Sequence, residues 1–170
     1  ELFESKIATG REVDLKGRRL FKMSLGDSTK SEEDWIYPDC LERGYVCLGF
    51  GGHTDFSGCD SLPAVRERYR SEYPEGKDTD FAATAVHYLK NELHQGDLVL
   101  VSDGNTRFRA IAEVVGPYAF EARAEGYEQT RPVRWLWNSS ESVPVSILSS
   151  KRLSQMSIYL IDQDAVNWDA

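Results

Sequence analysis

The pattern of apolar and polar residues is clearest between residues 95 and 118. Residues 98–101 form a β-branched and apolar run, and residues 107–115 alternate between apolar and polar side chains. One face of the second segment carries Phe108, Ala110, Ala112 and Val114. The connection, Asp103-Gly-Asn-Thr106, is rich in residues that tolerate unusual backbone angles. Two such segments around a short glycine-containing connection predict a β-hairpin.

Shorter patterns on either side of this hairpin predict further elements. The other predicted strands are residues 18–24, 45–50, 118–122, 131–137 and 157–161. The predicted helices are a segment that Pro38 interrupts and Gly44 ends, residues 62–73, residues 81–93, and a short helix or turn around residues 148–153. In the strand at 131–137, the alternation places Val133, Trp135 and Trp137 on one side. Together these predict an α+β fold, a small β-barrel of about six strands with three or so flanking helices.

A length of 170 residues suits one domain, large enough to bury a core without disulfides or metals. We expect a lead-in segment over residues 1–17, the domain over residues 18–161, and an acidic tail or linker over residues 162–170. Because the first residue is Glu1 rather than Met, we also expect a fragment or a processed chain.

The composition excludes several classes of protein. Hydrophobic residues make up 41% of the chain and charged residues 28%, which is typical of a folded globular domain. No apolar run approaches the roughly 20 residues that a membrane span needs. Cys40, Cys47 and Cys59 form no CxxC pair, so neither a zinc knuckle nor a disulfide framework is indicated. A reducing, cytoplasmic location is the simpler interpretation.

The net charge of −8 argues against a protein that coats nucleic acid by bulk electrostatics. Local basic segments remain, and on charge alone they are best interpreted as solvated surfaces. If the chain binds a duplex, the contacts to the DNA backbone must come from these segments. The candidates are Arg18, Arg19, Arg66, Arg68, Arg70, Arg107 and Arg109.

No motif in the chain indicates catalysis. There is no GxxxxGK[ST] phosphate-binding loop, nucleophile elbow, metal-binding carboxylate cluster or His-Asp pairing in the sequence. We therefore predict no catalytic residue, no metal site and no cofactor, and interpret the chain as a recognition domain and not an enzyme.

Four segments in a fixed order carry a family resemblance: SLGDSTKSEEDWIYPDC, LGFGGHTDFSGC, LVSDGNTRFRAI and RWLW. With the helix just before the hairpin, they resemble the EVE and YTH members of the PUA-like superfamily. Within that group they are most similar to the N-terminal recognition domains of McrB-type modification-dependent restriction GTPases. The resemblance covers roughly residues 18 to 161.

This resemblance implies a reader of double-stranded DNA that flips a modified, methylated base into an aromatic pocket. The positions that match the pocket of EVE and YTH relatives are Ser24, Asp27, Trp35, Phe50 and Tyr127, and the hairpin adds Ser102, Asp103 and Asn105. A GTPase motor and a partner nuclease would lie elsewhere in the full-length protein or its complex, with no membrane partner.

Several alternatives stay open at this point. Trp35 lies on an apolar helical face and can equally be a core residue, whereas Phe50 before a glycine pair is the better candidate for stacking. Asp103 can contact the ligand or only shape its turn, with Asp27 as the competing carboxylate. Two other functions fit the same fold, a PUA-like reader of modified RNA and a module that binds a small molecule or a protein.

Overall fold

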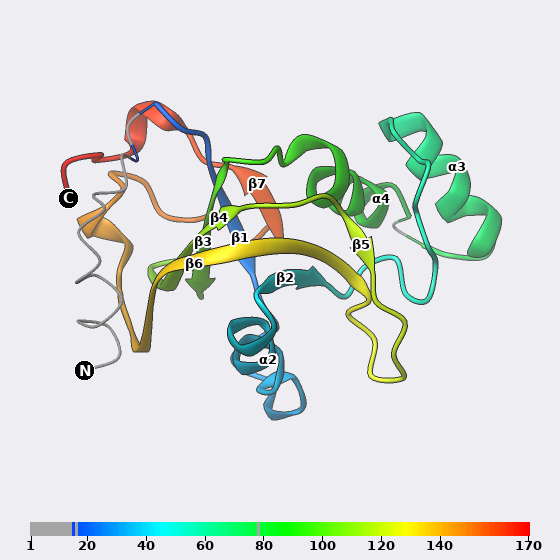
Figure 1. The fold of residues 1–170 in the computed structure, drawn as a ribbon, viewed down its shortest axis with the longest axis horizontal. Helices are drawn as coiled ribbons and strands as arrows, with labels where there is room; N and C mark the ends of the chain where they lie inside the picture. Colours follow the sequence, from blue (N-terminus) through cyan, green and yellow to red (C-terminus); the bar gives the residue numbers. More distant parts are fainter. Residues whose placement is uncertain (1–14, 16, 78) are drawn as a thin grey trace.

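The computed structural model describes residues 15, 17–77 and 79–170, which form an α+β domain (Figure 1). Its strands are β1 (Leu20–Ser24), β2 (Tyr45–Leu48), β3 (Leu98–Asp103), β4 (Arg107–Val114), β5 (Ala119–Phe120), β6 (Gln129–Pro144) and β7 (Ile158–Leu160). They form one sheet in the order β2-β6-β4-β3-β1-β7, with β5 paired to β6. The sheet curls into a half-barrel, which confirms the predicted fold class.

Three α-helices accompany the sheet in the described part of the chain, α2 (Ile36–Arg43), α3 (Leu62–Glu72) and α4 (Thr79–His87). The short helical turns are η1 (Ser31–Glu33), η2 (Tyr88–Glu92), η3 (Val145–Ile147) and η4 (Gln163–Ala165). In Figure 1, α3 and α4 lie together at one end of the sheet, and α2 lies beside β2. The predicted helix over residues 81–93 is thus α4 followed directly by η2.

The predicted hairpin is β3 and β4, which pair antiparallel as expected. The alternation in β4 is also confirmed, since Phe108, Ala110, Ala112 and Val114 are all buried. In β3 every residue from Leu98 to Val101 is buried, because both faces of this strand are covered. A continuous apolar run is the pattern expected of such a doubly covered strand.

The strand β1 lies beside β3 and runs parallel to it, with Ser24 in register with Ser102. The sequence indicated both strands but not their relative direction. Since the two strands are parallel, their carboxyl ends lie at the same edge of the sheet. The polar residues that follow each strand are therefore neighbours in space.

The long strand β6 contains the predicted strand at 131–137 and corrects one detail of it. Its pairing with β4 shifts between Ile111 and Ala112, so Ala112 pairs with Trp135 while Ile111 pairs with Trp137. Trp135 packs with the main core and Trp137 with a second cluster around Phe108. The two tryptophans do not share one side, because the bulge adds a residue that a strict alternation does not anticipate.

One helical prediction near proline was wrong, and another was placed a few residues too late. Pro38 does not interrupt its helix but lies in the first turn of α2, where the missing amide has no helical partner to lose. The short helix or turn expected around residues 148–153 begins earlier than predicted, as the helical turn η3, which directly follows Pro144. Val145 at its start donates its amide to the carbonyl of Thr106, which ties this turn to the hairpin connection.

The structure describes the C-terminal end of the chain but only two residues of the predicted lead-in segment. The lead-in segment over residues 1–17 lies outside the described residues except for Leu15 and Gly17. Residues 162–170 do not extend away from the domain, since Ala165 is buried and Trp168 packs against the second core cluster. Among the described residues, no helix has the length and apolar character needed to cross a membrane.

Candidate functional site

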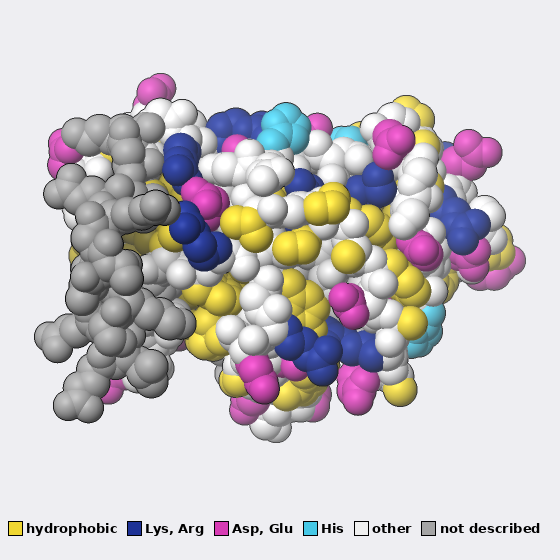
Figure 2. Space-filling model, in the orientation of Figure 1, with side chains coloured by type: hydrophobic (Ala, Val, Ile, Leu, Met, Phe, Trp, Pro, Cys, Tyr) yellow, Lys and Arg dark blue, Asp and Glu magenta, His cyan; other side chains and the backbone are white. Residues whose placement is uncertain are grey.

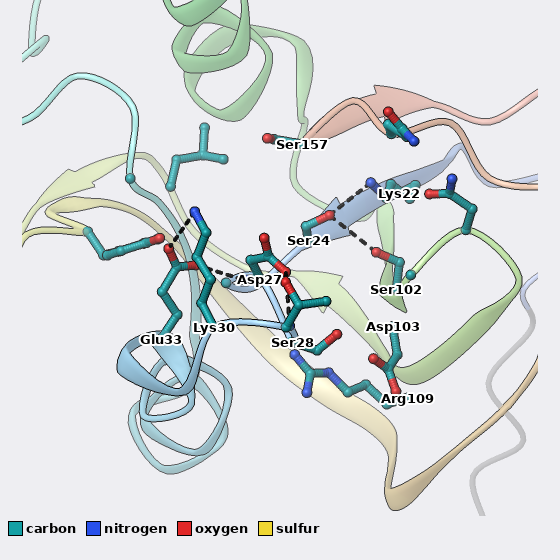
Figure 3. A pocket seen from close by; sticks show the side chains of 18 of the residues that line it. Lys22, Ser24, Asp27, Ser28, Lys30, Glu33, Ser102, Asp103, Arg109 and Ser157 are labelled. Carbon is teal, nitrogen blue, oxygen red and sulfur yellow. Dashed lines mark hydrogen bonds and ion pairs between the residues drawn. The ribbon is translucent and has the colours of Figure 1, made fainter.

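An open cleft of about 720 Å³ lies at the carboxyl ends of β1 and β3 (Figure 3). Ser24 ends β1, Ser102 and Asp103 end β3, and the segment after β1 adds Asp27 and Glu33. Ligand pockets in proteins commonly measure about 300–1,000 Å³, so the cleft has room for one small ligand. The parallel pairing of β1 and β3 therefore creates the site by bringing two polar strand ends together.

A buried lysine adjoins this polar edge. Lys22 is 1% exposed, and its Nζ donates to Ser24 Oγ over 2.8 Å and to the main-chain carbonyl of Met156. Ser24 Oγ lies 3.3 Å from Ser102 Oγ. Burial lowers the pKa of Lys22 to about 8, because desolvation disfavours the charged ammonium. The sequence analysis missed Lys22, although a lysine between Phe21 and Met23 in an otherwise apolar strand is an unusual position.

Two aromatic residues line the cleft, Phe50 and Tyr127. Phe50 follows β2 and lies edge-to-face against Phe81 of α4, with ring centroids 5.6 Å apart. Tyr127 lies just before β6 and has a φ of 59°, an unusual value for a bulky residue. Burial, followed by the nearby charge of Glu33, raises the pKa of the Tyr127 phenol. Both rings are half-buried, so each retains surface that a ligand can contact.

The strained backbone at Tyr127 is held by Arg123. Its guanidinium donates to the main-chain carbonyls of Gly126 and Tyr127, each over 2.8 Å. The same group donates to Asp39 over 3.0 Å and to the hydroxyl of Tyr45 over 2.6 Å. Arg123 thereby ties the Tyr127 loop to α2 and β2, which offsets the cost of the positive φ. The sequence gave no indication that Arg123 holds the Tyr127 loop, since an isolated arginine in a polar loop is normally interpreted as a surface residue.

The predicted Trp35 does not line the cleft. Its ring lies edge-to-face against Tyr127 with centroids 5.9 Å apart, and the Arg123 guanidinium lies 5.0 Å from its ring centroid. Trp35 therefore supports Tyr127 from behind and is packed against the main core. The core interpretation that the sequence left open describes this residue.

The other seven predicted pocket residues come together around one cleft, although they derive from four separate segments. They are Ser24, Asp27, Phe50, Ser102, Asp103, Asn105 and Tyr127. Several lining residues were not predicted for the pocket, namely Lys22, Lys30, Glu33, Arg109, Gln155 and Ser157 among others. Gln155 and Ser157 precede β7, and only the pairing of β7 with β1 brings them to the cleft.

The two competing carboxylates have different surroundings. Asp27 Oδ1 accepts from both the amide and the hydroxyl of Thr29, at 2.9 and 2.7 Å. These two bonds lower the pKa of Asp27, with the hydroxyl of Thr29 as the larger cause. The side chain of Asp103 has no hydrogen-bond or ion-pair partner among the described residues, and it borders the cleft. Asp27 thus shapes its own loop, while Asp103 has a carboxylate available to a ligand.

Of the seven arginines predicted to contact DNA, only Arg109 borders the cleft. Its Nη2 donates to the carbonyl of Leu25 over 3.2 Å, and the guanidinium lies 4.1 Å from the ring centroid of Tyr37. Its Nε is buried with no hydrogen-bond partner among the described residues. No carboxylate within the described ranges forms an ion pair with Arg109, so its charge remains available to an anion.

Most of the remaining arginines are paired with acidic residues. Arg18 forms an ion pair with Glu113, and Arg19 with Asp97. Arg66 and Arg70 share Asp80, and Arg68 lies 3.5 Å from Glu72. Arg107 donates to the side chain and the carbonyl of Ser142. These contacts reduce the positive charge that each paired arginine offers to a phosphate.

The surface carries no broad positive area on the face drawn in Figure 2, where basic and acidic side chains alternate among apolar ones. This distribution agrees with the net charge of −8. Within the described residues, no group of three or more His, Cys, Asp and Glu side chains is arranged to hold a metal ion.

The fold and the cleft define a small α+β domain with one open polar and aromatic cleft at the ends of two parallel strands. The chain belongs to the family described as "Domain of unknown function (DUF8426)", whose model matches residues 21–162. None of the curated protein sequences matches the chain.

One solved structure similar to the chain is the YTH domain of the Zygosaccharomyces rouxii MRB1 protein, crystallised in complex with N6-methyladenosine RNA. The two share 17% sequence identity with a TM-score of 0.41, over 84% of this chain and 71% of the other. A likeness of this degree does not carry a function from one protein to the other.

Proposed function

We propose that the cleft holds a single modified base flipped out of double-stranded DNA. The chain would then act as the recognition domain of a modification-dependent restriction system. The observation that carries this proposal is that Phe50 and Tyr127 line the same cleft as the polar residues at the ends of β1 and β3. A flipped base needs a ring surface to stack on and polar groups for its edge. Stacking on an aromatic side chain contributes roughly 1–3 kcal/mol per base.

The charges around the cleft favour a neutral ligand group over a polyphosphate. Three basic side chains border it, Lys22, Lys30 and Arg109, together with three acidic ones, Asp27, Glu33 and Asp103. A site for several phosphates would show an excess of basic groups and backbone amides. A nucleobase instead presents a flat ring with both donors and acceptors at its edge, which suits mixed surroundings of this kind.

The resemblance of the sequence to McrB-type recognition domains supports DNA over RNA and supplies the restriction context. In that context the GTPase motor and the nuclease belong to other domains or subunits. Arg109 supports a nucleic-acid ligand independently, because a guanidinium without a carboxylate partner at the rim of the cleft can bind the phosphate beside the inserted base.

Equilibrium binding to four matched oligomer sets tests the proposal. The sets are DNA duplexes and RNA strands of one sequence, each with and without a methylated base, and with 5-methylcytosine and 6-methyladenine in separate series. We expect tighter binding to one modified duplex than to its plain counterpart. A preference confined to modified RNA would replace DNA by RNA as the ligand, and equal binding to all oligomers would refute base recognition.

The substitution Phe50→Ala tests whether the cleft is the site. Loss of one stacking surface should weaken binding to the modified duplex by about 1–3 kcal/mol and leave binding to the plain duplex unchanged. Phe81→Ala is the matched control, since Phe81 contacts Phe50 but does not line the cleft. Circular dichroism should first show that both variants are folded. Equal losses on the two duplexes would remove Phe50 from the site.

A further inference from the structure

The hydroxyl of Ser24 belongs to a hydrogen-bond chain with a fixed direction. A protonated lysine has three donors and no acceptor, so Ser24 Oγ must accept from Lys22 Nζ. At the other end, Ser102 Oγ donates to the main-chain carbonyl of Met23 over 3.4 Å. The proton of Ser24 consequently points away from Lys22, toward Ser102 or into the cleft.

The distances along this chain are uneven. The bond from Lys22 to Ser24 measures 2.8 Å, whereas the two hydroxyls of Ser24 and Ser102 are 3.3 Å apart. Hydroxyl groups in good hydrogen bonds lie about 2.7–2.8 Å from their acceptors. The Ser24 hydroxyl therefore donates only a weak hydrogen bond in the free protein. An acceptor placed in the cleft at a normal distance would form a better bond than Ser102 does.

We propose that Ser24 donates this proton to a hydrogen-bond acceptor on the edge of the inserted base, and that Lys22 is the positioning residue that makes Ser24 a donor. This inference rests on the proposed function of the cleft. Accepting from an ammonium withdraws electron density from the Ser24 oxygen, which strengthens its O–H as a donor. The free carboxylate of Asp103 can only accept when ionised. The ligand is then a base that presents an acceptor and an N–H donor on one edge.

The burial of Lys22 fits this role. The side chain is 1% exposed, so water contributes little to the solvation of its charge, and its fixed partners are the serine and the Met156 carbonyl. Its lowered pKa of about 8 makes its protonation measurable near neutral pH. Among the described residues, the other charged or titratable side chains around the cleft are Asp27, Lys30, Glu33, Asp103, Arg109 and Tyr127, and Tyr159 of β7 pairs with Lys22.

Three variants of the full chain test the pair, each measured on the modified DNA duplex that the wild type prefers and on its plain counterpart. Ser24→Ala and Lys22→Met should each lower affinity for the modified duplex about ten- to a hundred-fold and leave binding to the plain duplex unchanged. Lys151→Met is the control, because Lys151 does not border the cleft, is more than half exposed and lies 2.6 Å from Asp162. It should change neither affinity more than about two-fold.

Two further measurements separate this role from a structural one. The first uses a duplex in which the ring acceptor nitrogen of the modified base is replaced by a C–H group. The wild type should bind this altered duplex as weakly as Ser24→Ala binds the normal modified duplex. Ser24→Ala should bind the altered duplex no more weakly than it binds the normal modified one. The wild-type preference for the modified duplex should also fall as the pH rises above about 8, and Lys22→Met should show no such profile. If Lys22 were needed only for folding, we would expect neither these matched losses nor this dependence of the preference on pH.

The outcomes distinguish this inference from the proposed function. A folded wild-type protein with no preference for any modified base overturns both. A wild type that prefers a modified duplex, together with Ser24→Ala or Lys22→Met variants that keep this preference, overturns the inference alone. Parallel losses in Lys22→Met and Lys151→Met would also overturn it, since a general effect of positive charge would then explain the result.

Discussion

The phenol ring of Tyr127 lies directly on the main chain of Gly49. A Cβ added to Gly49 would meet the Tyr127 Cζ atom at 3.0 Å and its Cε1 atom at 3.1 Å. These distances are shorter than ordinary van der Waals contacts, so any side chain at Gly49 must displace the ring. Gly49 therefore limits where the Tyr127 ring can lie, and Arg123 holds the Tyr127 backbone through a hydrogen bond to its carbonyl.

Gly49→Ala should weaken base recognition through Tyr127. The added methyl group pushes the ring away from its position in the cleft, and loss of a well-placed stacking surface lowers the affinity for a modified duplex by about 1–3 kcal/mol. Plain duplex binding should change little. Fluorescence-anisotropy titration of both duplexes measures the two affinities.

Gly58→Ala is the control for this substitution. Gly58 has a φ of +84° and no atom within 4 Å of an added Cβ, and it does not border the cleft. The alanine should lower the free energy of unfolding by roughly 1 kcal/mol through backbone strain, without changing selectivity between the duplexes. If both glycine variants lose selectivity to the same degree, reduced stability and not the ring position explains the Gly49 result.

Arg109→Gln should weaken binding to modified and plain duplexes alike. A phosphate contact carries no information on the base, and its loss should reduce the slope of log affinity against log salt by about 1. Arg68→Gln serves as the comparison, because Arg68 lies 3.5 Å from Glu72 and away from the cleft. If the salt dependence is unchanged in Arg109→Gln and reduced in Arg68→Gln, the DNA backbone contacts α3 and not the rim of the cleft.

The sequence allowed the central part of the fold to be predicted because local pattern and tertiary structure agree there. The alternation of β4 matches its buried face, and the glycine-containing turn fixes the hairpin. The resemblance to EVE and YTH relatives then indicated Ser24, and the hairpin added Ser102 and Asp103. They lie together because β1 and β3 are parallel, a relationship between segments over 70 residues apart that no local pattern specifies.

The features that the sequence did not reveal depend on long-range contacts. The bulge that separates Trp135 from Trp137 arises in the pairing of β6 with β4, so periodicity alone placed both on one side. Trp35 is an aromatic residue of the kind expected in a base-binding pocket, but Tyr127 lies between its ring and the cleft. Lys22 is buried by residues from the segment before β7, as its bond to the carbonyl of Met156 shows.

Asp103→Asn and Asp27→Asn should have different effects, although both residues border the cleft. The free carboxylate of Asp103 is available to accept from an amino or ring N–H group of the base. Its replacement should reduce selectivity for the modified duplex about ten- to a hundred-fold while weak, salt-sensitive binding remains. The Asp27 carboxylate already bonds to Thr29, so Asp27→Asn should act mainly on the local loop.

The measurement is the ratio of affinities for modified and plain duplexes in each folded variant. Selectivity retained in Asp103→Asn and lost in Asp27→Asn would reverse the two roles. In that case the bonds from Thr29 would serve to hold Asp27 in a ligand-binding orientation.

Lys22 should make the stability of the protein depend on pH in the alkaline range. Its pKa is lowered from 10.5 to about 8 in the folded chain, so between these values the unfolded chain binds more protons than the folded one. Stability therefore rises with pH over this window, because the folded state no longer holds a desolvated charge. The contribution of Lys22 between pH 8 and 10 is about 2 kcal/mol. Above about pH 10 the ionisation of tyrosine acts in the opposite direction, since burial raises the pKa of Tyr45, Tyr118 and Tyr127 in the folded state.

Denaturant unfolding of the wild type and of Lys22→Met at several values between pH 7 and 10 measures this contribution. The free energy of unfolding of the wild type should rise relative to that of Lys22→Met by about 2 kcal/mol from pH 8 to 10. Lys30→Met should follow the wild type, because its lysine is more than half exposed and is not desolvated in the same way. Parallel curves for the wild type and Lys22→Met would show that Lys22 keeps an ordinary pKa, and its ammonium would then be accessible to water in solution.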